Sequence, residues 1–293
     1  MLQLLIPLLL CLAQFGLAQD PLKILQAAPF SISYNYTIPS KFNIATPTDI
    51  SQEDVELHGV FGKKDFSDKS FLVYSFRTHK QSFEVKENQA QLHRSRIDLY
   101  QIDFPITYIR NDTNWLQVLR VAPGVYSDLK EIDGRDFDVA TSYLATYKND
   151  RHLQWIIGLS HNRQFGEEIT FPLFGFKFRP NDSLLIGAIL PRVYILYAID
   201  RSHLTQFTIS PAGNKWNILR EQNETTDQSV NISYRSFRAG VSYEYMLPNL
   251  LSIKMEIGQI FGRELDAFNF SDINRSFKID DSKFASLSIQ KRF

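Results

Sequence analysis

A histidine and a serine two residues apart are the side chains in this sequence best placed for nucleophilic chemistry. His93 and Ser95 flank Arg94 in the segment QLHRSRIDLY. If this segment is a strand, positions i and i+2 place both side chains on one face. The imidazole could then activate the serine hydroxyl as a general base, with a carboxylate or amide orienting it. This pair is the weak candidate for a catalytic site, and it would make the protein a hydrolase.

Other features of the sequence favour the view that there is no catalytic site. A spacing of two residues is frequent by chance, and Arg94 and Arg96 indicate the end of a strand beside a loop. The sequence has no zinc-protease motif, paired-cysteine motif, glycine-rich phosphate loop or calcium-binding loop. We therefore predict no metal and no cofactor, and keep the hydrolase as an alternative.

The composition points to strands and away from nucleic acid. The chain has 293 residues, with 32 basic and 32 acidic side chains, so its formal net charge is zero. This balance removes the main electrostatic argument for nucleic-acid binding. The chain is rich in aromatic residues, with 23 Phe and 13 Tyr. Such residues fit the pleated, half-buried surface of a sheet.

The N-terminus has the pattern of a cleavable signal peptide. The segment MLQLLIPLLLCLAQFGLAQD holds an apolar run followed by small residues before position 19. We expect cleavage between Ala18 and Gln19, so that residues 1–18 form the signal peptide and 19–28 a short periplasmic lead-in. Cys11 is the one cysteine of the chain and would leave with the signal peptide. An exported chain without cysteines is more typical of a bacterial envelope protein than of a eukaryotic secreted domain.

Alternation of apolar and polar residues recurs along residues 29–293. In SFRAGVSYEYML, one face holds Phe237, Ala239, Val241, Tyr243 and Tyr245. In LLSIKMEIGQIF, one face holds Leu251, Ile253, Met255 and Ile257. The same period of two occurs in the ranges 71–77, 100–109, 137–147 and 153–159. Such runs are typical of half-buried antiparallel strands.

The connections between these runs alternate in length. Short turns are expected at 111–114, 148–151, 180–182 and 248–249, and longer loops at 124–135, 161–168, 212–229 and 262–281. This rhythm is typical of an up-and-down transmembrane β-barrel with short periplasmic turns and long outer loops. We predict an all-β, antiparallel barrel over residues 29–293 with about 12 strands, within a range of 10 to 14. The uncertain stretch surrounds Pro191, which could separate two strands or lie in a bulge.

The strands of a soluble barrel or sandwich would show the same alternation. The positions of the charged residues help to distinguish such a soluble protein from a membrane barrel. Several predicted strands carry charged residues near their middle. In a soluble barrel these side chains would face the outside water, whereas in a membrane barrel they would point into the lumen. The residues that we expect to face the lumen are Asp103, Arg238, Glu244, Lys254 and Glu256. These charges favour the membrane barrel, and a soluble secreted β-protein remains an alternative.

The end of the chain carries a resemblance. In FASLSIQKRF, apolar residues alternate up to a final aromatic, at Ala285, Leu287, Ile289 and Phe293. This segment resembles the last strand of Gram-negative outer-membrane barrels, which acts as an assembly signal. Lys291 departs from that pattern, because an apolar or aromatic residue is usual at its position.

The central segments NWLQVLRVAPGVYSD and FPLFGFKFRPNDSLLIGAILPRVYILYAI are similar to a bacterial family of outer-membrane barrels known only as a domain of unknown function. The resemblance implies export to the bacterial outer membrane and contact with its lipids. It also implies periplasmic chaperones and the barrel-assembly machinery as partners during biogenesis.

We therefore predict an outer-membrane barrel that is a narrow porin-like channel or a structural envelope protein. Barrels of eight strands are filled by side chains and barrels of 16 conduct, so about 12 strands lie between these cases. Lumen charges of mixed sign predict little ion selectivity. The alternatives are an outer-membrane lipid hydrolase that uses His93 and Ser95, and the soluble β-protein.

Overall fold

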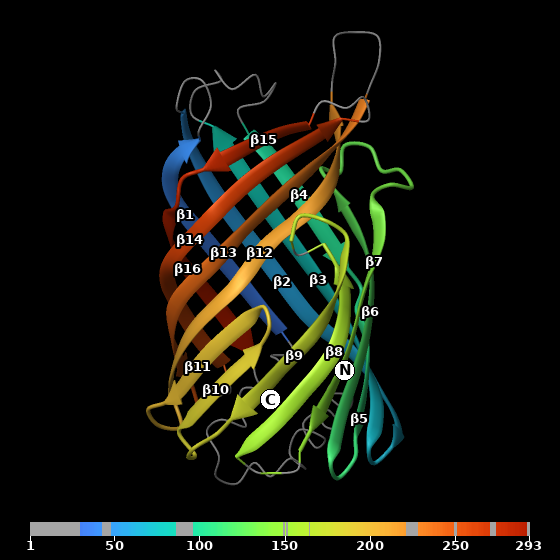
Figure 1. Cartoon of the computed structure of the whole chain (residues 1–293), viewed down its shortest axis with the longest axis vertical. Helices are drawn as coiled ribbons and strands as arrows, with labels where there is room; N and C mark the ends of the chain where they lie inside the picture. Colours follow the sequence, from blue (N-terminus) through green and yellow to red (C-terminus); the bar gives the residue numbers. More distant parts are fainter. Residues whose placement is uncertain are drawn as a thin grey trace.

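The computed structural model describes residues 30–42, 48–85, 96–148, 150, 152–163, 165–220, 228–248, 251–269 and 274–291, and β-strands make up most of them (Figure 1). None of these residues belongs to a helix long and apolar enough to cross a membrane. The strands are β1 (Phe30–Phe42), β2 (Thr48–Ser67), β3 (Ser70–Val85), β4 (Arg96–Asp103), β5 (Ile106–Asn111), β6 (Trp115–Ser127), β7 (Phe137–Tyr147), β8 (Leu153–Asn162), β9 (Ile169–Phe178), β10 (Leu184–Ile189), β11 (Arg192–Ala198), β12 (His203–Arg220), β13 (Gln228–Met246), β14 (Leu251–Asn269), β15 (Asn274–Ile279) and β16 (Ser282–Lys291).

These strands form one closed antiparallel barrel. The first strand pairs with β2 on one side and with β16 on the other, so that Phe30 lies opposite Lys291 and the sheet has no free edge there. Two pairs of segments are single barrel strands with an interruption. β4 and β5 both lie between β3 and β6, and β15 and β16 both lie between β1 and β14. The described part of the chain therefore makes a 14-stranded barrel, which confirms the predicted fold at the upper limit of the predicted strand number.

The segment around Pro191 partly explains why the barrel has more than 12 strands. β10 and β11 are two separate short strands that pair with each other from Leu184–Tyr197 to Ile189–Arg192. Leu190 and Pro191 form the tip of this hairpin. Proline cannot donate a backbone hydrogen bond, which suits a position between strands. Figure 1 shows the hairpin near the end of the barrel where the short turns gather.

The outer face of the barrel is apolar. On β8, Trp155 is 56% exposed, and Ile157 and Leu159 point the same way. On β14, Ile257 is 69% exposed. A soluble barrel would direct these residues inward, whereas a lipid-facing wall exposes them.

Two of the four predicted long loops are wrong. Most of 212–229 and 262–281 is strand, because β12 continues to Arg220, β13 begins at Gln228, and β14 continues to Asn269. The reason is that the polarity of the two faces of the sheet is reversed at the end of the barrel with the longer loops. The inner positions become apolar, and the outer positions become charged, as in the ion pair that Arg235 Nε makes with Glu264 Oε2 at 2.6 Å. The alternation that marked a lipid-facing strand is therefore lost, and the segments resemble loops.

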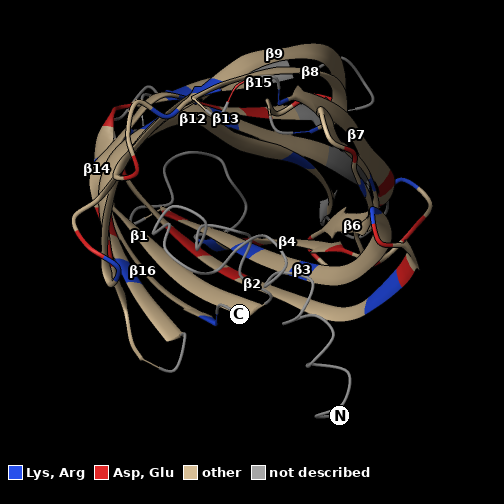
Figure 2. Ribbon diagram, turned by 90° about the horizontal axis from the view of Figure 1, so that it is seen from below, with Lys and Arg blue, Asp and Glu red and all other residues tan. Residues whose placement is uncertain are grey.

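The strands differ greatly in length around the barrel. β12 has 18 residues and β13 has 19, whereas β10 has 6 and β11 has 7. At the end with the longer loops, β6 pairs directly with β12 between Ser127 and Asn217. Figure 2 shows the barrel end-on, with its wall enclosing an oval lumen and charged residues distributed around it. The barrel therefore narrows at this end, since the five strands between β6 and β12 have already finished.

Candidate functional site

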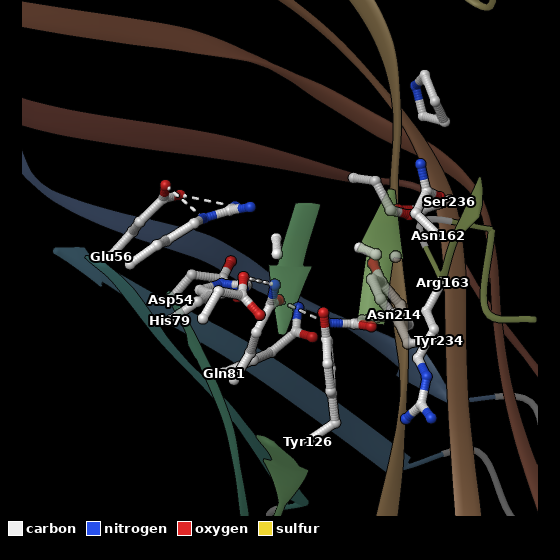
Figure 3. A pocket seen from close by; sticks show the side chains of 18 of the residues that line it. Asp54, Glu56, His79, Gln81, Tyr126, Asn162, Arg163, Asn214, Tyr234 and Ser236 are labelled. Carbon is white, nitrogen blue, oxygen red and sulfur yellow. Dashed lines mark hydrogen bonds and ion pairs between the residues drawn. The ribbon is translucent and has the colours of Figure 1, made fainter. Parts of the chain in front are cut away.

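The lumen contains a polar cavity of about 550 Å³. Its lining comes from strands on all sides of the barrel, including β2, β3, β4, β6, β8 and β12. Figure 3 shows ten of the lining residues by label, among them Asp54, His79, Tyr126 and Asn214. Because the outer face is apolar and this inner surface is polar, the cavity is the candidate site of the protein.

One wall of the cavity holds paired charges on β2 and β3. Arg77 donates from Nε to Glu56 Oε1 at 2.9 Å and from a terminal nitrogen to Glu56 Oε2 at 3.3 Å. His79 Nε2 lies 3.5 Å from Asp54 Oδ1, and Gln52 donates to the other oxygen of Asp54 at 3.2 Å. These neighbours fix both carboxylates against the wall.

A chain of hydrogen bonds crosses the lumen. Asn214 of β12 donates to Gln101 Oε1 of β4 at 2.6 Å, and Gln101 donates to Asp103 Oδ2 at 2.5 Å. Asn214 and Gln101 are 113 positions apart in the sequence. The contact joins two strands that are not neighbours in the sheet. The polar side chains therefore narrow the passage as well as lining it.

Apolar side chains fill the lumen beyond the cavity, at the end with the longer loops. We call this group the apolar plug; its buried members are Ile50, Phe83, Val85, Leu99, Tyr126, Trp216, Ile232, Tyr234, Leu265 and Ile279. Trp216 is 0% exposed, and the rings of Phe83 and Tyr234 meet edge to face at 5.2 Å. The narrower end of the barrel allows these side chains to meet inside the lumen, so the plug fills part of the lumen at this end.

A buried arginine ties the loop after β8 to the barrel. Arg163 Nε lies 2.6 Å from Asp138 Oδ2, and a terminal nitrogen lies 3.0 Å from Glu168 Oε1. The guanidinium also donates to the backbone oxygen of Lys215 on β12 at 3.3 Å and stacks over the ring of Tyr126 at 4.7 Å. These contacts join β7, the β8–β9 loop and β12, which are not sequential neighbours.

The charges predicted to face the lumen lie on the inner face of the wall. Asp103 and Arg238 line the cavity. Glu256 accepts from Arg238 Nε at 3.3 Å. Glu244 and Lys254 lie directly opposite each other on β13 and β14, and the neighbouring positions on both strands carry tyrosine, isoleucine and methionine. The structure thus groups four of the five residues on one pair of strands and places Asp103 elsewhere in the lumen, on β4.

Phe284 is an inner-face residue that sequence reasoning missed. It stands among the apolar residues of the last strand but points into the lumen, where its ring lies 3.6 Å from the Arg238 guanidinium carbon. Beneath it are Gly240 and Gly258, whose missing Cβ atoms leave room for the ring. The two glycines at the same level of adjacent predicted strands were the signal that could have revealed it.

Arg263 was also missed, because it falls in a segment that was predicted as a loop. It is almost completely buried, and it donates to Tyr234 Oη at 3.3 Å and to Gln52 Oε1 at 3.3 Å. A third contact goes to the backbone oxygen of Asp280 at 3.1 Å. The guanidinium therefore joins three separate parts of the wall beside the apolar plug.

The predicted assembly segment lies on β16. Ala285, Leu287 and Ile289 are exposed on the outer face and pair with β1 and β14. Phe293 lies outside the described residues, as do the cleavage positions Ala18 and Gln19. The two hydrolase candidates, His93 and Ser95, also lie outside the described residues. The structure therefore leaves the catalytic alternative, the cleavage site and the final aromatic as predictions.

Comparisons with known proteins give one family and several barrels of similar shape. The COG4313 outer-membrane channel from Pseudomonas putida F1 is 9% identical, with a TM-score of 0.46, over 95% of this chain and 98% of that one. The toluene transporter TodX from Pseudomonas putida is 9% identical, with a TM-score of 0.42, over 94% and 92%. OccAB4 from Acinetobacter baumannii is 9% identical, with a TM-score of 0.30, over 92% and 99%.

The barrel fold of this chain is established by the pairing of its own strands. The comparison with curated proteins gives no match. The model of the domain of unknown function DUF6268 matches residues 61–289, which is most of the chain. The protein therefore belongs to the DUF6268 family.

Proposed function

We propose that this protein is a narrow, porin-like channel of the bacterial outer membrane. The observation that carries the proposal is a polar cavity of about 550 Å³ inside a closed barrel whose outer face is apolar. A barrel with a structural role alone gains nothing from a polar, hollow lumen, because burying unpaired polar groups is costly.

Polar side chains line part of the inner wall between the cavity and the end with the short turns. On β1 and β16, the inner positions are Ser31, Ser33, Ser286 and Ser288, which alternate with exposed apolar residues and remain partly accessible. Since short turns are typical of the periplasmic side, this end faces the periplasm. We expect small hydrophilic solutes to reach the cavity along this serine-lined strip, because the buried apolar cluster at this end, Leu196, Ala198, Leu204 and Met246, belongs to β11, β12 and β13.

The charges of the cavity predict little ion selectivity. Its lining includes Arg77, Arg120, Arg163, Arg192 and Arg238 together with Asp54, Glu56 and Asp103. Carboxylates that adjoin the lining offset part of the positive excess, because Glu256 pairs with Arg238 and Asp138 pairs with Arg163. A pore with balanced charge discriminates weakly between cations and anions.

Recording in planar lipid bilayers tests the proposal. The refolded mature protein should give discrete current steps, with a reversal potential near zero in a gradient of potassium chloride. Heat-modifiable migration on gels would first establish that the barrel is folded. Folded protein that gives no current would contradict the channel and leave a closed, structural barrel.

The location and biogenesis belong to the same proposal. We infer that residues 1–18 direct export, and that periplasmic chaperones and the barrel-assembly machinery insert the barrel among outer-membrane lipids. Mass spectrometry of the purified protein should find Gln19 at the N-terminus. Depletion of the assembly machinery should reduce the folded form in outer-membrane fractions, whereas an unchanged amount would contradict this route.

A further inference from the structure

Two arginines of the cavity lining have no carboxylate partner. Arg77, Arg163 and Arg238 each lie close to a carboxylate oxygen, at 2.9, 2.6 and 3.3 Å. Arg120 and Arg192 line the same cavity, and neither makes an ion pair with any residue that the structure describes. We propose that these two guanidiniums bind a small organic dianion, such as a dicarboxylate, inside the cavity. The inference names a solute class for the proposed channel and rests on that function.

Both guanidiniums are free to accept a ligand. Arg192 is exposed, and its guanidinium carbon lies 5.8 Å from the ring centre of Tyr194. Arg120 is half-buried, and a charge in that environment is normally paired because water solvates it incompletely. Asp103 lies on the neighbouring strand β4, but it accepts a hydrogen bond from Gln101 and forms no ion pair with Arg120. The counter-charge of the two arginines must therefore come from outside the described wall.

The two arginines lie at similar heights in the lumen. Arg120 precedes Ser127 of β6 by seven residues, and Ser127 pairs in parallel with Asn217 of β12. On the other side, the last residue pair between β11 and β12 places Arg192 level with Ser210. Ser210 also precedes Asn217 by seven residues. Because β6 and β12 run parallel from their contact, Arg120 and Arg192 are at similar distances from it.

A strip of hydroxyl groups extends across the wall from Arg120. Ser142 of β7 pairs directly with Arg120, and Ser160 of β8 pairs with Ser142. All three residues line the cavity. Serine hydroxyls can donate hydrogen bonds to a carboxylate without adding charge. The strip continues the polar surface from β6 towards β11, which lies five strands away in the sheet (Figure 1).

The size and charge of the site indicate the class of ligand. A cavity of about 550 Å³ is in the range of sites for small molecules. A guanidinium binds a carboxylate through two parallel hydrogen bonds. Two guanidiniums without partners in one cavity therefore suit one solute with two acidic groups, whereas a neutral solute would leave both charges uncompensated. The lumen as a whole stays balanced, so the dianion is bound by these contacts and the pore still discriminates weakly between potassium and chloride.

Isothermal titration calorimetry of the folded protein in detergent micelles tests the site without requiring a current. The dicarboxylates from malonate to adipate are compared at neutral pH, and the tightest is then compared with its monoamide and its diamide. One dianion should bind per barrel. The monoamide should bind at least about tenfold more weakly, as the loss of a charged hydrogen-bonded pair implies, and the diamide should not bind. Equal affinities of the dianion and the monoamide would overturn the proposal.

Substitutions then assign the two arginines. Arg120→Gln and Arg192→Gln should each weaken binding of the dicarboxylate by at least about tenfold. Arg120→Lys and Arg192→Lys keep the charge but lose the two-bond geometry, so their affinities should be intermediate. Arg110→Gln is the matched control, because Arg110 of β5 pairs with Asp112 at 2.8 Å and does not line the cavity. With heat-modifiable migration showing that each barrel is folded, unchanged affinity in either cavity glutamine variant would contradict the site.

Currents in planar bilayers separate the site from the channel. The tightest dicarboxylate should reduce the potassium chloride current of the wild-type protein in a saturable manner. The same block should require at least about tenfold more dicarboxylate in Arg192→Gln. Dicarboxylate binding by a folded protein that gives no current would reject the channel and retain the site. Current through a protein that binds no dicarboxylate would retain the channel and overturn the site.

Discussion

Asn217 of β12 pairs in parallel with Ser127 of β6, although five strands of the barrel lie between their strands. Asn217 also donates from Nδ2 to Asp136 Oδ1 at 2.9 Å, and Asp136 is completely buried. Beyond the ends of strands β7 to β11, the wall therefore closes again, directly between β6 and β12. This second closure makes the narrow end in which the apolar plug is packed.

The apolar plug should contribute strongly to the stability of the barrel. Trp216→Ala removes the largest completely buried side chain of the described residues and leaves a hole in the apolar plug. We expect the free energy of unfolding in lipid vesicles to fall by about 3–5 kcal/mol, as large-to-small changes of aromatic residues in cores do. Phe66→Ala is the control, since Phe66 is exposed near the β2–β3 turn. Equal urea midpoints for the two variants would show that the plug is loosely packed.

The Arg163 contacts should behave as a coupled, buried ion pair. Arg163→Ala leaves the Asp138 carboxylate without the cation that lies 2.6 Å from it. Removing one partner of such a pair costs about 3–5 kcal/mol, because the remaining charge is buried and uncompensated. We expect Arg163→Ala to lower the free energy of unfolding by this order, and Arg163→Ala with Asp138→Asn to recover part of it.

A double-mutant cycle measures that coupling. The sum of the two single effects should exceed the effect of the double variant by more than about 1 kcal/mol, the range in which contacting residues couple. Strictly additive effects would show that Arg163 acts through the backbone of Lys215 and the ring of Tyr126 instead.

The space beneath Phe284 should tolerate no added methyl group. A Cβ at Gly240 would lie 2.9 Å from Phe284 Cζ and 2.6 Å from Glu256 Oε1. We expect Gly240→Ala to lower the free energy of unfolding by about 1–3 kcal/mol, as overpacking does. Gly134→Ala is the matched control, because nothing lies within 4 Å of its Cβ position. Adding Phe284→Ala should remove the overpacking cost of Gly240→Ala, and an undiminished cost would locate the strain elsewhere.

The parts of this molecule that face lipid were predictable from the sequence. Val241 and Ile257 alternate with polar residues because one face meets hydrocarbon and the other meets water, and this contrast has a period of two. The part of the barrel beyond the membrane was not predictable in this way. There Trp216 and Leu265 point inward and Lys215 points outward, so the regular alternation is interrupted and the sequence of these segments resembles that of loops.

The site was less predictable than the fold for a related reason. Asn214 and Gln101 meet across the lumen, and nothing in either segment alone specifies a partner 113 positions away. Arg163 follows a strand end in the sequence, where a solvated loop charge is the usual interpretation. Its burial depends on β7 and β12 both reaching it, which only the closed barrel brings about.

The last strand gives a prediction about assembly. Lys291 pairs with Phe30 of β1 and with Leu251 of β14, so its backbone completes the closure whatever its side chain is. Phe293 resembles the final aromatic of outer-membrane barrels, and the resemblance implies a role for it in assembly. If this resemblance holds, we expect Phe293→Ser to reduce the heat-modifiable, folded form in outer membranes several-fold. Lys291→Tyr restores the usual pattern and should leave the folded amount equal or higher; equal assembly of the two variants would show that this strand is recognised by other positions.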